Sequence, residues 1–308
     1  MLGSTADSLF WMFRYIERAE NTLCVIESGF QLYLMSSTNL YNEWDAILRT
    51  NSIRQYFLKK NSSLDSLKII NFMLKDSRNV NNILSLVSKA RENARKSRVS
   101  ITTDVWESIN TCWLYLNKEL NKHVSENKIQ LILQTTREKI ALIFGFLEKT
   151  MLKNEILNFC YLGTYIEKFD NTARILNTRQ YLFLDEKKYR LEGYDNFQLE
   201  MILRSMSSYR SFMWKNQNEI KPKKVSYFLI SDEDMPKSLM FCINETLKNL
   251  KSINKKKFKK SKSYINALGI QKKIKLKNIS LNNYSFLNGL IKLNMDLASN
   301  IEIEFNFH

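Results

Sequence analysis

The sequence has few of the residues that end helices and form tight turns. It contains 7 glycines and 2 prolines in 308 residues. A sheet-rich chain of this length needs many turns, in which glycine and proline supply the backbone angles. Their scarcity argues against a sheet-based fold and indicates long helices. Because 44% of the residues are hydrophobic, the chain can also bury a large core. We predict an all-α fold.

Cysteine is equally sparse, and its four copies lie far apart in the sequence. No Cys-x-x-Cys pair occurs, so the spacing fits neither a disulfide framework nor a thiolate zinc site. Free thiols are typical of a reducing cytoplasm. The four residues are Cys24, Cys112, Cys160 and Cys242.

The usual catalytic motifs are absent. The sequence has no Gly-x-Gly-x-x-Gly, no P-loop, no Gly-x-Ser-x-Gly and only two histidines, His123 and His308. Nucleophilic catalysis of the common kinds therefore lacks its base. We expect a protein that does not catalyse a reaction by itself.

Long apolar runs are also missing. No stretch of about 18 apolar residues occurs, which argues against a transmembrane helix. Asp7, Arg14 and Glu17 interrupt the N-terminal region where a secretory signal would be apolar. The expected location is the cytoplasm.

Acidic residues disappear from one segment near the C-terminus. Residues 246–295 contain thirteen lysines and no acidic residue, and removing these from the 47 basic residues leaves 34 against 31 acidic ones. The rest of the chain is thus nearly neutral, which argues against a general nucleic-acid-binding fold. We expect a flexible, lysine-rich insertion at about 248–278, because dense like charge opposes compact folding. Its densest part could bind nucleic acid, an acidic membrane or an acidic protein and contains Lys255, Lys256, Lys257, Lys259, Lys260 and Lys262.

Hydrophobic periodicity begins near residue 1 with apolar residues three and four positions apart. Further helices are predicted at 41–59, 64–74, 80–96, 103–121, 127–149, 155–183, 197–215, 237–250 and 284–299. Two short segments, 274–277 and 301–307, alternate with period two and predict a small antiparallel strand pair.

An internal repeat is the most informative feature. Tyr-Ile-Glu-Arg-Ala-Glu-Asn-Thr at 15–22 returns as Tyr-Ile-Glu-Lys-Phe-Asp-Asn-Thr at 165–172, an offset of 150 residues. We interpret it as a duplicated helix in one domain, 1–308, with halves of about 1–150 and 151–308. Coincidence between two amphipathic helices is the alternative.

Each copy of the motif places polar residues on one helix face. These are Arg14, Glu17, Arg18 and Asn21 in the first copy, where Glu20 adjoins the apolar stripe, and Glu167, Asp170, Asn171 and Arg174 in the second. Carboxylates beside apolar neighbours must be paired or metal-bound. We favour a buried ion-pair network between the halves. A Mg²⁺ site at Glu17, Glu20, Glu167 and Asp170 is the alternative, since Mg²⁺ prefers oxygen ligands. A ferritin-like di-iron site would need histidines near these motifs.

A row of guanidinium groups follows on another predicted helix. Arg91, Arg95 and Arg98 lie at i, i+4 and i+7 and share one face. Such a row can clamp phosphate or carboxylate groups, pair internally with Glu17 and Glu167, or face solvent.

The chain resembles the bacterial alpha-E domain family from its N-terminus to about residue 250. The resemblance is carried by Leu-Gly-Ser-Thr-Ala-Asp-Ser-Leu-Phe-Trp-Met-Phe-Arg-Tyr-Ile-Glu-Arg-Ala-Glu-Asn-Thr at 2–22, by Ala-Arg-Glu-Asn-Ala-Arg at 90–95, by Trp-Glu-Ser-Ile-Asn at 106–110, by Tyr-Ile-Glu-Lys at 165–168 with Asp170, and by Met-Pro-Lys-Ser at 235–238. Lys168 and Lys237 stand where the family usually has arginine, which weakens any bidentate binding at these two positions.

The resemblance implies a context rather than a chemistry. Members of the family typically occur beside, or fused to, a circularly permuted ATP-grasp ligase, often with a transglutaminase-like peptidase. This context implies an accessory partner of an ATP-grasp amide or peptide ligase. We expect the two motif helices and the row of Arg91, Arg95 and Arg98 to form a polar cleft between the halves, for a peptide substrate or for the ligase. A Mg²⁺-dependent enzyme of the same pathway, or a polybasic adaptor for nucleic acid or a membrane surface, is the alternative.

Overall fold

The computed structural model describes residues 1–35, 41–61, 63–122, 124–182, 194–276 and 283–307. All regular structure in these ranges is helical, and no described residue forms a strand. The prediction of an all-α fold is therefore confirmed. None of the helices in these ranges is long and apolar enough to cross a lipid bilayer.

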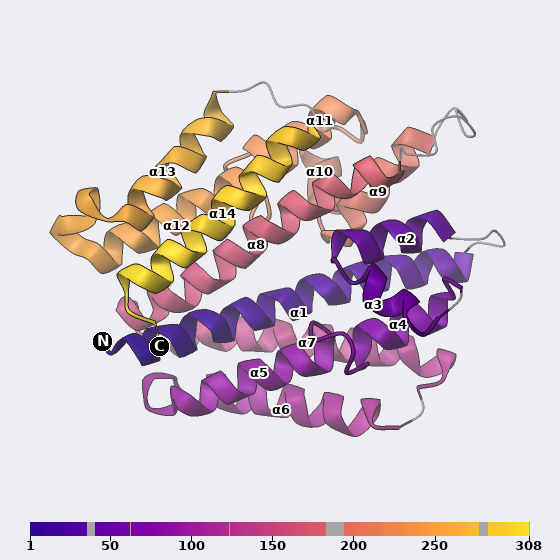
Figure 1. The fold of residues 1–308 in the computed structure, drawn as a ribbon, viewed down its shortest axis with the longest axis horizontal. Helices are drawn as coiled ribbons and strands as arrows, with labels where there is room; N and C mark the ends of the chain where they lie inside the picture. The colour runs from indigo at the N-terminus through magenta and orange to yellow at the C-terminus, as the bar shows by residue number, and fades with distance from the viewer. Residues whose placement is uncertain (36–40, 62, 123, 183–193, 277–282, 308) are drawn as a thin grey trace.

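The helices form two successive series (Figure 1). The first consists of α1 (Gly3–Met35), α2 (Tyr41–Thr50), α3 (Arg54–Leu58), α4 (Ser66–Leu74), α5 (Ile83–Lys96), the 3₁₀ turn η1 (Arg98–Ser100), α6 (Thr103–Leu120) and α7 (Glu126–Thr150). The second consists of α8 (Glu155–Leu182), α9 (Tyr194–Ser205), α10 (Tyr209–Lys215), α11 (Pro222–Ser226), the π-helical turn η3 (Tyr227–Ser231), α12 (Leu239–Asn254), the 3₁₀ segment η4 (Lys255–Lys260), α13 (Lys262–Lys275) and α14 (Tyr284–Glu304).

Each series folds into a four-helix bundle. In the first, α1 packs on α5, α5 on α6, α6 on α7, and α7 on α1. In the second, α8, α12, α13 and α14 make the same cycle of contacts. Each series therefore consists of one long helix, several short helices and three further bundle helices, in the same order along the chain.

The two bundles meet where α1 and α8 lie side by side and run in the same direction (Figure 1). Gly163 on α8 allows the two backbones to touch, because a Cβ there would lie 2.1 Å from the carbonyl oxygen of Phe10. This close approach brings polar side chains from both helices within reach of one another.

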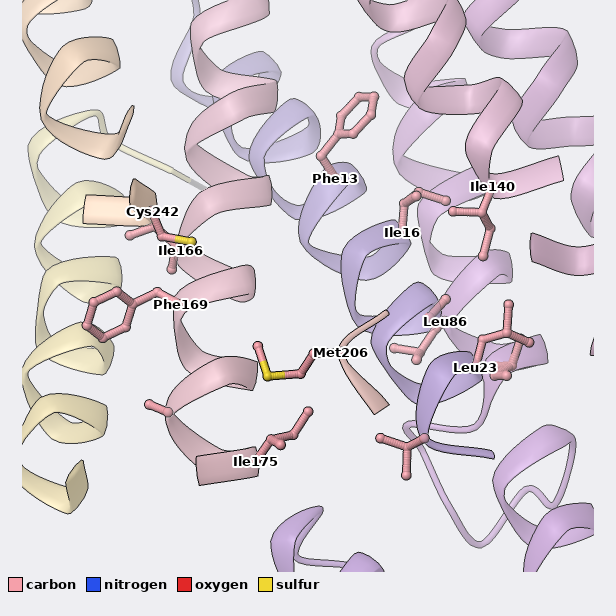
Figure 2. Packing of buried hydrophobic residues seen from close by; sticks show 14 of the residues in the cluster. Phe13, Ile16, Leu23, Leu86, Ile140, Ile166, Phe169, Ile175, Met206 and Cys242 are labelled. Atoms are coloured by element: carbon pink, nitrogen blue, oxygen red, sulfur yellow. The ribbon is translucent and has the colours of Figure 1, made fainter. Parts of the chain in front are cut away.

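The hydrophobic core extends to both sides of this interface. Figure 2 shows Ile16 and Leu23 of α1 on the side of Leu86 and Ile140, and Ile166 of α8 on the side of Cys242. Ile16 and Ile166 are 150 residues apart and both are buried. Equivalent apolar positions of the repeated helices thus supply the cores of the two bundles.

A left-handed residue ends the first short helix of each series. Ser52 follows α2 with φ 57°, and Ser207 follows α9 with φ 52°. In both turns the next residue donates its N–H to the carbonyl five residues earlier, over 2.9 Å. The predicted helices 41–59 and 197–215 are therefore wrong as single helices, since each is broken at this turn.

A pair of aromatic rings also recurs. Phe57 and Phe72 pack with ring centroids 5.3 Å apart, and so do Phe212 and Phe228. Both pairs connect a short helix after the left-handed turn with the segment that precedes the next bundle helix. The repeat therefore includes the short helices as well as the long ones.

The lysine-rich segment is helical through Lys275, in contrast to the flexible insertion expected at 248–278. It forms the end of α12, η4 and α13, and the carboxylate of Glu304 accepts hydrogen bonds from Ser261 Oγ and the backbone N–H of Ser263 over 3.0 Å each. These contacts and the burial of Ile270 and Ile274 hold the segment against its neighbours. Residues 277–278 of the expected insertion lie outside the described residues.

The predicted strand pair is wrong. Residues 274 and 275 belong to α13, and residues 301–304 belong to α14. Leu290, Leu297 and Ile301 are all buried on α14, so the helical period continues through the alternating segment. Four to seven alternating residues are too short a signal to outweigh the helix that precedes them.

Candidate functional site

The two copies of the repeated motif face each other across the α1–α8 interface. Arg18 Nε donates to Glu167 Oε1 over 2.6 Å, and Lys168 Nζ lies 3.7 Å from Glu17 Oε2. In the repeat Glu17 corresponds to Glu167, and Arg18 corresponds to Lys168. Each motif thus supplies the acid for the base of the other, as at an interface between two-fold related subunits. The ion-pair network predicted between the halves is present.

Glu167 is buried and strongly paired. It accepts two hydrogen bonds from Arg18, at 2.6 and 2.9 Å, and one from Arg14 Nε at 3.0 Å. Burial alone would raise the pKa of Glu167, but the two guanidinium charges and their hydrogen bonds outweigh it and lower the pKa to about 2. Glu167 therefore stays ionised and holds Arg14 and Arg18 in place.

Glu17 is buried without comparable support. Its side chain is fully shielded from solvent, and neither carboxylate oxygen has a hydrogen-bond partner among the described residues. Burial raises the pKa of Glu17 to about 7, although the nearby charge of Lys168 acts against this shift. The pKa is therefore raised at Glu17 and lowered at its repeat equivalent, Glu167.

The second acidic residue of each motif is also paired. Glu20 Oε1 lies 4.0 Å from Lys237 Nζ, and Arg174 Nε donates to Asp170 Oδ2 over 2.6 Å. Burial and the neighbouring charge of Glu167 raise the pKa of Asp170. Keeping Asp170 ionised therefore costs free energy, and a hydrogen-bond donor beside its carboxylate would offset that cost.

A cavity of about 220 Å³ opens beside Glu167. Its lining comes from α1, α8, α4 and the loops that follow α2 and α4. The lining residues are Arg18, Asn21, Thr22, Asn51, Ser52, Ile53, Met73, Asn79, Asn81, Glu167, Asp170, Asn171 and Arg174. Two guanidinium groups and two carboxylates balance in charge, and amide and hydroxyl groups make up most of the remainder.

Two polar atoms of this lining are buried without a partner within the described structure. They are Nδ2 of Asn21, whose residue is 4% exposed, and Oδ1 of Asp170. An unsatisfied buried donor or acceptor costs about 1–3 kcal/mol. Neither atom is accessible from the cavity as it stands, so a ligand that supplied one acceptor and one donor would remove both costs once the two side chains turn toward it.

The sequence predicted part of this cavity and missed the rest. Arg18, Asn21, Glu167, Asp170, Asn171 and Arg174 were expected at a polar cleft, and all six line the cavity. Glu17 and Glu20, also expected there, do not. The lining residues that were missed lie mostly on loops, where no helical period marks them, and are Thr22, Asn51, Ser52, Ile53, Met73, Asn79 and Asn81.

The row of Arg91, Arg95 and Arg98 does not join this site. Arg91 Nε donates to Asn110 Oδ1 over 2.6 Å, and its guanidinium lies 4.2 Å from the Trp113 ring centroid. Arg98 stacks over Trp106 at 4.7 Å, while Arg95 is exposed. The predicted pairing of this row with Glu17 and Glu167 is therefore wrong. The guanidinium partners are Arg14 and Arg18, which already lie at the interface.

The carboxylates do not form the alternative Mg²⁺ site. No group of three or more His, Cys, Asp or Glu side chains in the described part of the chain is placed to hold a metal ion. Glu167 and Asp170 are bound by arginines, whereas Glu17 and Glu20 lie beside lysines. The two motif helices thus bring bases, rather than more acids, to each carboxylate.

The four cysteines are buried as free thiols. Burial raises the pKa of Cys112 and of Cys242 to about 12, and it also raises the pKa of Cys24 and Cys160. Thiols in this state are packing groups and not nucleophiles.

The lysine cluster faces solvent, and none of its residues lines the cavity. Five of its predicted members have exposed side chains on η4 and at the start of α13. They are Lys255, Lys257, Lys259, Lys260 and Lys262. Lys256 belongs to η4, and its side chain lies outside the described residues.

Comparison with known families shows which one the chain matches. The model of the Alpha-E family, described as a predicted alpha-helical domain with a conserved ER motif, matches residues 1–305. Glu17-Arg18 is the one Glu-Arg dipeptide in the sequence. No curated protein and no solved structure matches the chain.

Proposed function

Since the chain belongs to the alpha-E family, we propose that it is a non-catalytic helical partner of an ATP-grasp amide or peptide ligase. In this proposal the cavity between α1 and α8 holds a small polar substrate for the ligase. The family context suggests the ligase as the partner. The geometry of the cavity suggests where the substrate binds.

The observation that carries the proposal is the pair of unsatisfied polar atoms in the cavity wall, on Asn21 and Asp170. Buried polar atoms are almost always hydrogen-bonded, so each exception calls for an explanation, and a ligand or water in the cavity would supply one for these two. The wall around them is fixed by the ion pairs of Glu167, so the site is formed before a ligand arrives.

The state of the cysteines and of Glu167 in the described structure supports a binding role. The cysteine thiols are buried with raised pKa values, and Glu167 is fully engaged by Arg14 and Arg18. In this proposal the chain presents or retains a substrate, and the ligase supplies ATP and the chemistry of amide formation.

Reconstitution with a circularly permuted ATP-grasp ligase from the same source organism tests the proposal. We expect the two proteins to co-purify, and the rate of amide formation to rise when this chain is added. Asp170→Asn should lose this increase, whereas Glu20→Gln, at the equivalent position outside the cavity, should keep it. An unchanged rate at saturating wild-type protein would rule the accessory role out.

The exposed lysines favour a second candidate, an adaptor for nucleic acid or an acidic membrane surface. Lys257, Lys259 and Lys260 project into solvent from one short segment. Clustered exposed charge of one sign attracts polyanions in a salt-dependent way.

A further inference from the structure

The wall of the cavity selects against several classes of ligand. Its ionised side chains balance, with Arg18 and Arg174 against Glu167 and Asp170. A phosphate site would show an excess of positive charge and a divalent cation site an excess of carboxylates. The favoured ligand therefore carries no large net charge.

The wall also lacks the surface on which flat ligands stack. None of the residues that line it is aromatic. Nucleobases are commonly held against aromatic rings, so a nucleoside or a single-stranded nucleic acid is disfavoured. Ile53 and Met73 provide the apolar part of the lining, which is enough for a small side chain.

The unsatisfied atoms then specify complementary groups on the ligand. Oδ1 of Asp170 requires a donor, and a cationic donor also offsets the burial of its charge. Nδ2 of Asn21 requires an acceptor. Nη1 of Arg18 makes only a long contact of 3.4 Å to Asn81 Oδ1 on the same wall and can strengthen its bonding to an anionic acceptor.

From these three constraints we infer that the cavity binds a free α-amino acid, with its ammonium group on Asp170 and its carboxylate on Asn21 and Arg18. A zwitterion is the small ligand that is neutral overall, presents one cationic donor and one anionic acceptor, and needs no stacking surface. The inference rests on the proposed function, in which the cavity holds a substrate of an amide ligase. It names the class of that substrate.

Calorimetric titration with the twenty proteinogenic amino acids, one at a time, tests the inference. We expect at least one to bind with a dissociation constant below about 1 mM, a 1:1 stoichiometry and a saturable heat. Its N-acetyl and carboxamide derivatives, which lack the ammonium and the carboxylate, should each bind at least about tenfold more weakly. If no amino acid binds, or if both derivatives bind as well as the parent, the inference is overturned.

Matched variants locate the binding. Asp170→Asn and Asn21→Ala should each weaken binding by about ten- to hundredfold, because each removes a buried charged or polar contact. Glu20→Gln, the repeat equivalent of Asp170 outside the cavity, should leave the affinity unchanged. Circular dichroism and thermal melting of each variant separate lost binding from lost folding. Unaltered affinity in folded Asp170→Asn contradicts the assignment.

The two proposals can fail separately. Loss of amino-acid binding with retained stimulation of the ligase overturns the ligand and leaves the partnership. Retained binding without any effect on the ligase overturns the partnership and leaves the ligand.

Discussion

Arg18 on α1 donates two hydrogen bonds to Glu167 on α8. In the equivalent pair, Lys168 Nζ lies 3.7 Å from Glu17 Oε2 and donates no hydrogen bond to it. The difference follows from the side chains. A guanidinium group bonds a carboxylate through two nitrogens in a fixed plane, and an ammonium group acts as a point charge. Glu167 also accepts a hydrogen bond from Arg14. The matching position in the second half is Thr164, which has no charge to offer Glu17. The two copies of the motif therefore hold one strongly paired acid, Glu167, and one weakly paired acid, Glu17.

Glu167→Gln should destabilise the fold strongly. The substitution leaves Arg14 and Arg18 largely buried without their anion, and breaking a buried ion pair typically costs about 3–5 kcal/mol. Urea unfolding at pH 7 measures the loss. Glu20→Gln is the matched control, since Glu20 is more exposed and lies 4.0 Å from its lysine, and it should cost less than about 1 kcal/mol.

The same variant should show its effect only above acid pH. Because the folded pKa of Glu167, about 2, lies below its ordinary value of 4.5, its ion pairs contribute stability fully above about pH 4.5. That contribution is lost as pH falls from about 4.5 to 2. The difference between wild type and Glu167→Gln should shrink over this range, and a constant difference would contradict the lowered pKa.

Glu17 should respond to pH with the opposite sign. Its folded pKa of about 7 lies above its ordinary value of 4.5, so the folded state binds the proton more tightly and becomes less stable as pH rises from about 4.5 to 7. Glu17→Gln removes this dependence. Relative to wild type, the variant should gain stability between pH 5 and pH 8 in urea unfolding. A relative stability that falls or stays flat over this range would show that Lys168 compensates the charge fully.

The contact between α1 and α8 makes its own prediction. Gly163→Ala should destabilise the protein by about 1–3 kcal/mol, because the new Cβ would meet the carbonyl oxygen of Phe10 at 2.1 Å and force the helices apart. Gly145→Ala on α7 is the control, since nothing lies within 4 Å of its added Cβ. There the higher helix propensity of alanine should raise stability by up to about 1 kcal/mol. Similar effects of the two substitutions on thermal unfolding would contradict the close approach.

Sequence reasoning succeeded where a long periodic signal existed. The repeat of Glu17-Arg18 as Glu167-Lys168 predicted two related halves joined by ion pairs, and the structure places these residues face to face. It failed at turns without a local signal. Ser52 and Ser207 adopt positive φ, a conformation that glycine normally marks, and each divides a predicted helix. Comparison of the two halves with each other could have aligned these serines, but a single turn residue gives little warning.

The assignment of partners could not be read from the sequence. Arg91 has the helical spacing of an ion-pair partner, yet it lies toward α6. There its guanidinium bonds Asn110 and stacks over Trp113. Periodicity fixes which residues share a helix face, but it does not fix which neighbouring helix that face meets. Loop residues such as Asn79 and Asn81 reach the cavity only through the packing of α4 and α5 against α1.

The exposed lysines should affect binding to polyanions and leave the fold unchanged. Replacing Lys257, Lys259 and Lys260 by glutamine removes three solvent-facing charges that form no ion pair among those found in the described structure. Deleting the segment instead would remove Ser261, which caps α13 and bonds to Glu304, and would confuse binding with folding. If the chain is an adaptor, the triple variant should bind a duplex oligonucleotide or vesicles with acidic lipid more weakly, with a reduced dependence on salt concentration.

The matched control replaces the exposed lysines Lys96, Lys118 and Lys128 of the first half, which carry the same charge without the clustering. Equal effects of the two triple variants would show that only net charge matters, and the adaptor role would then be rejected.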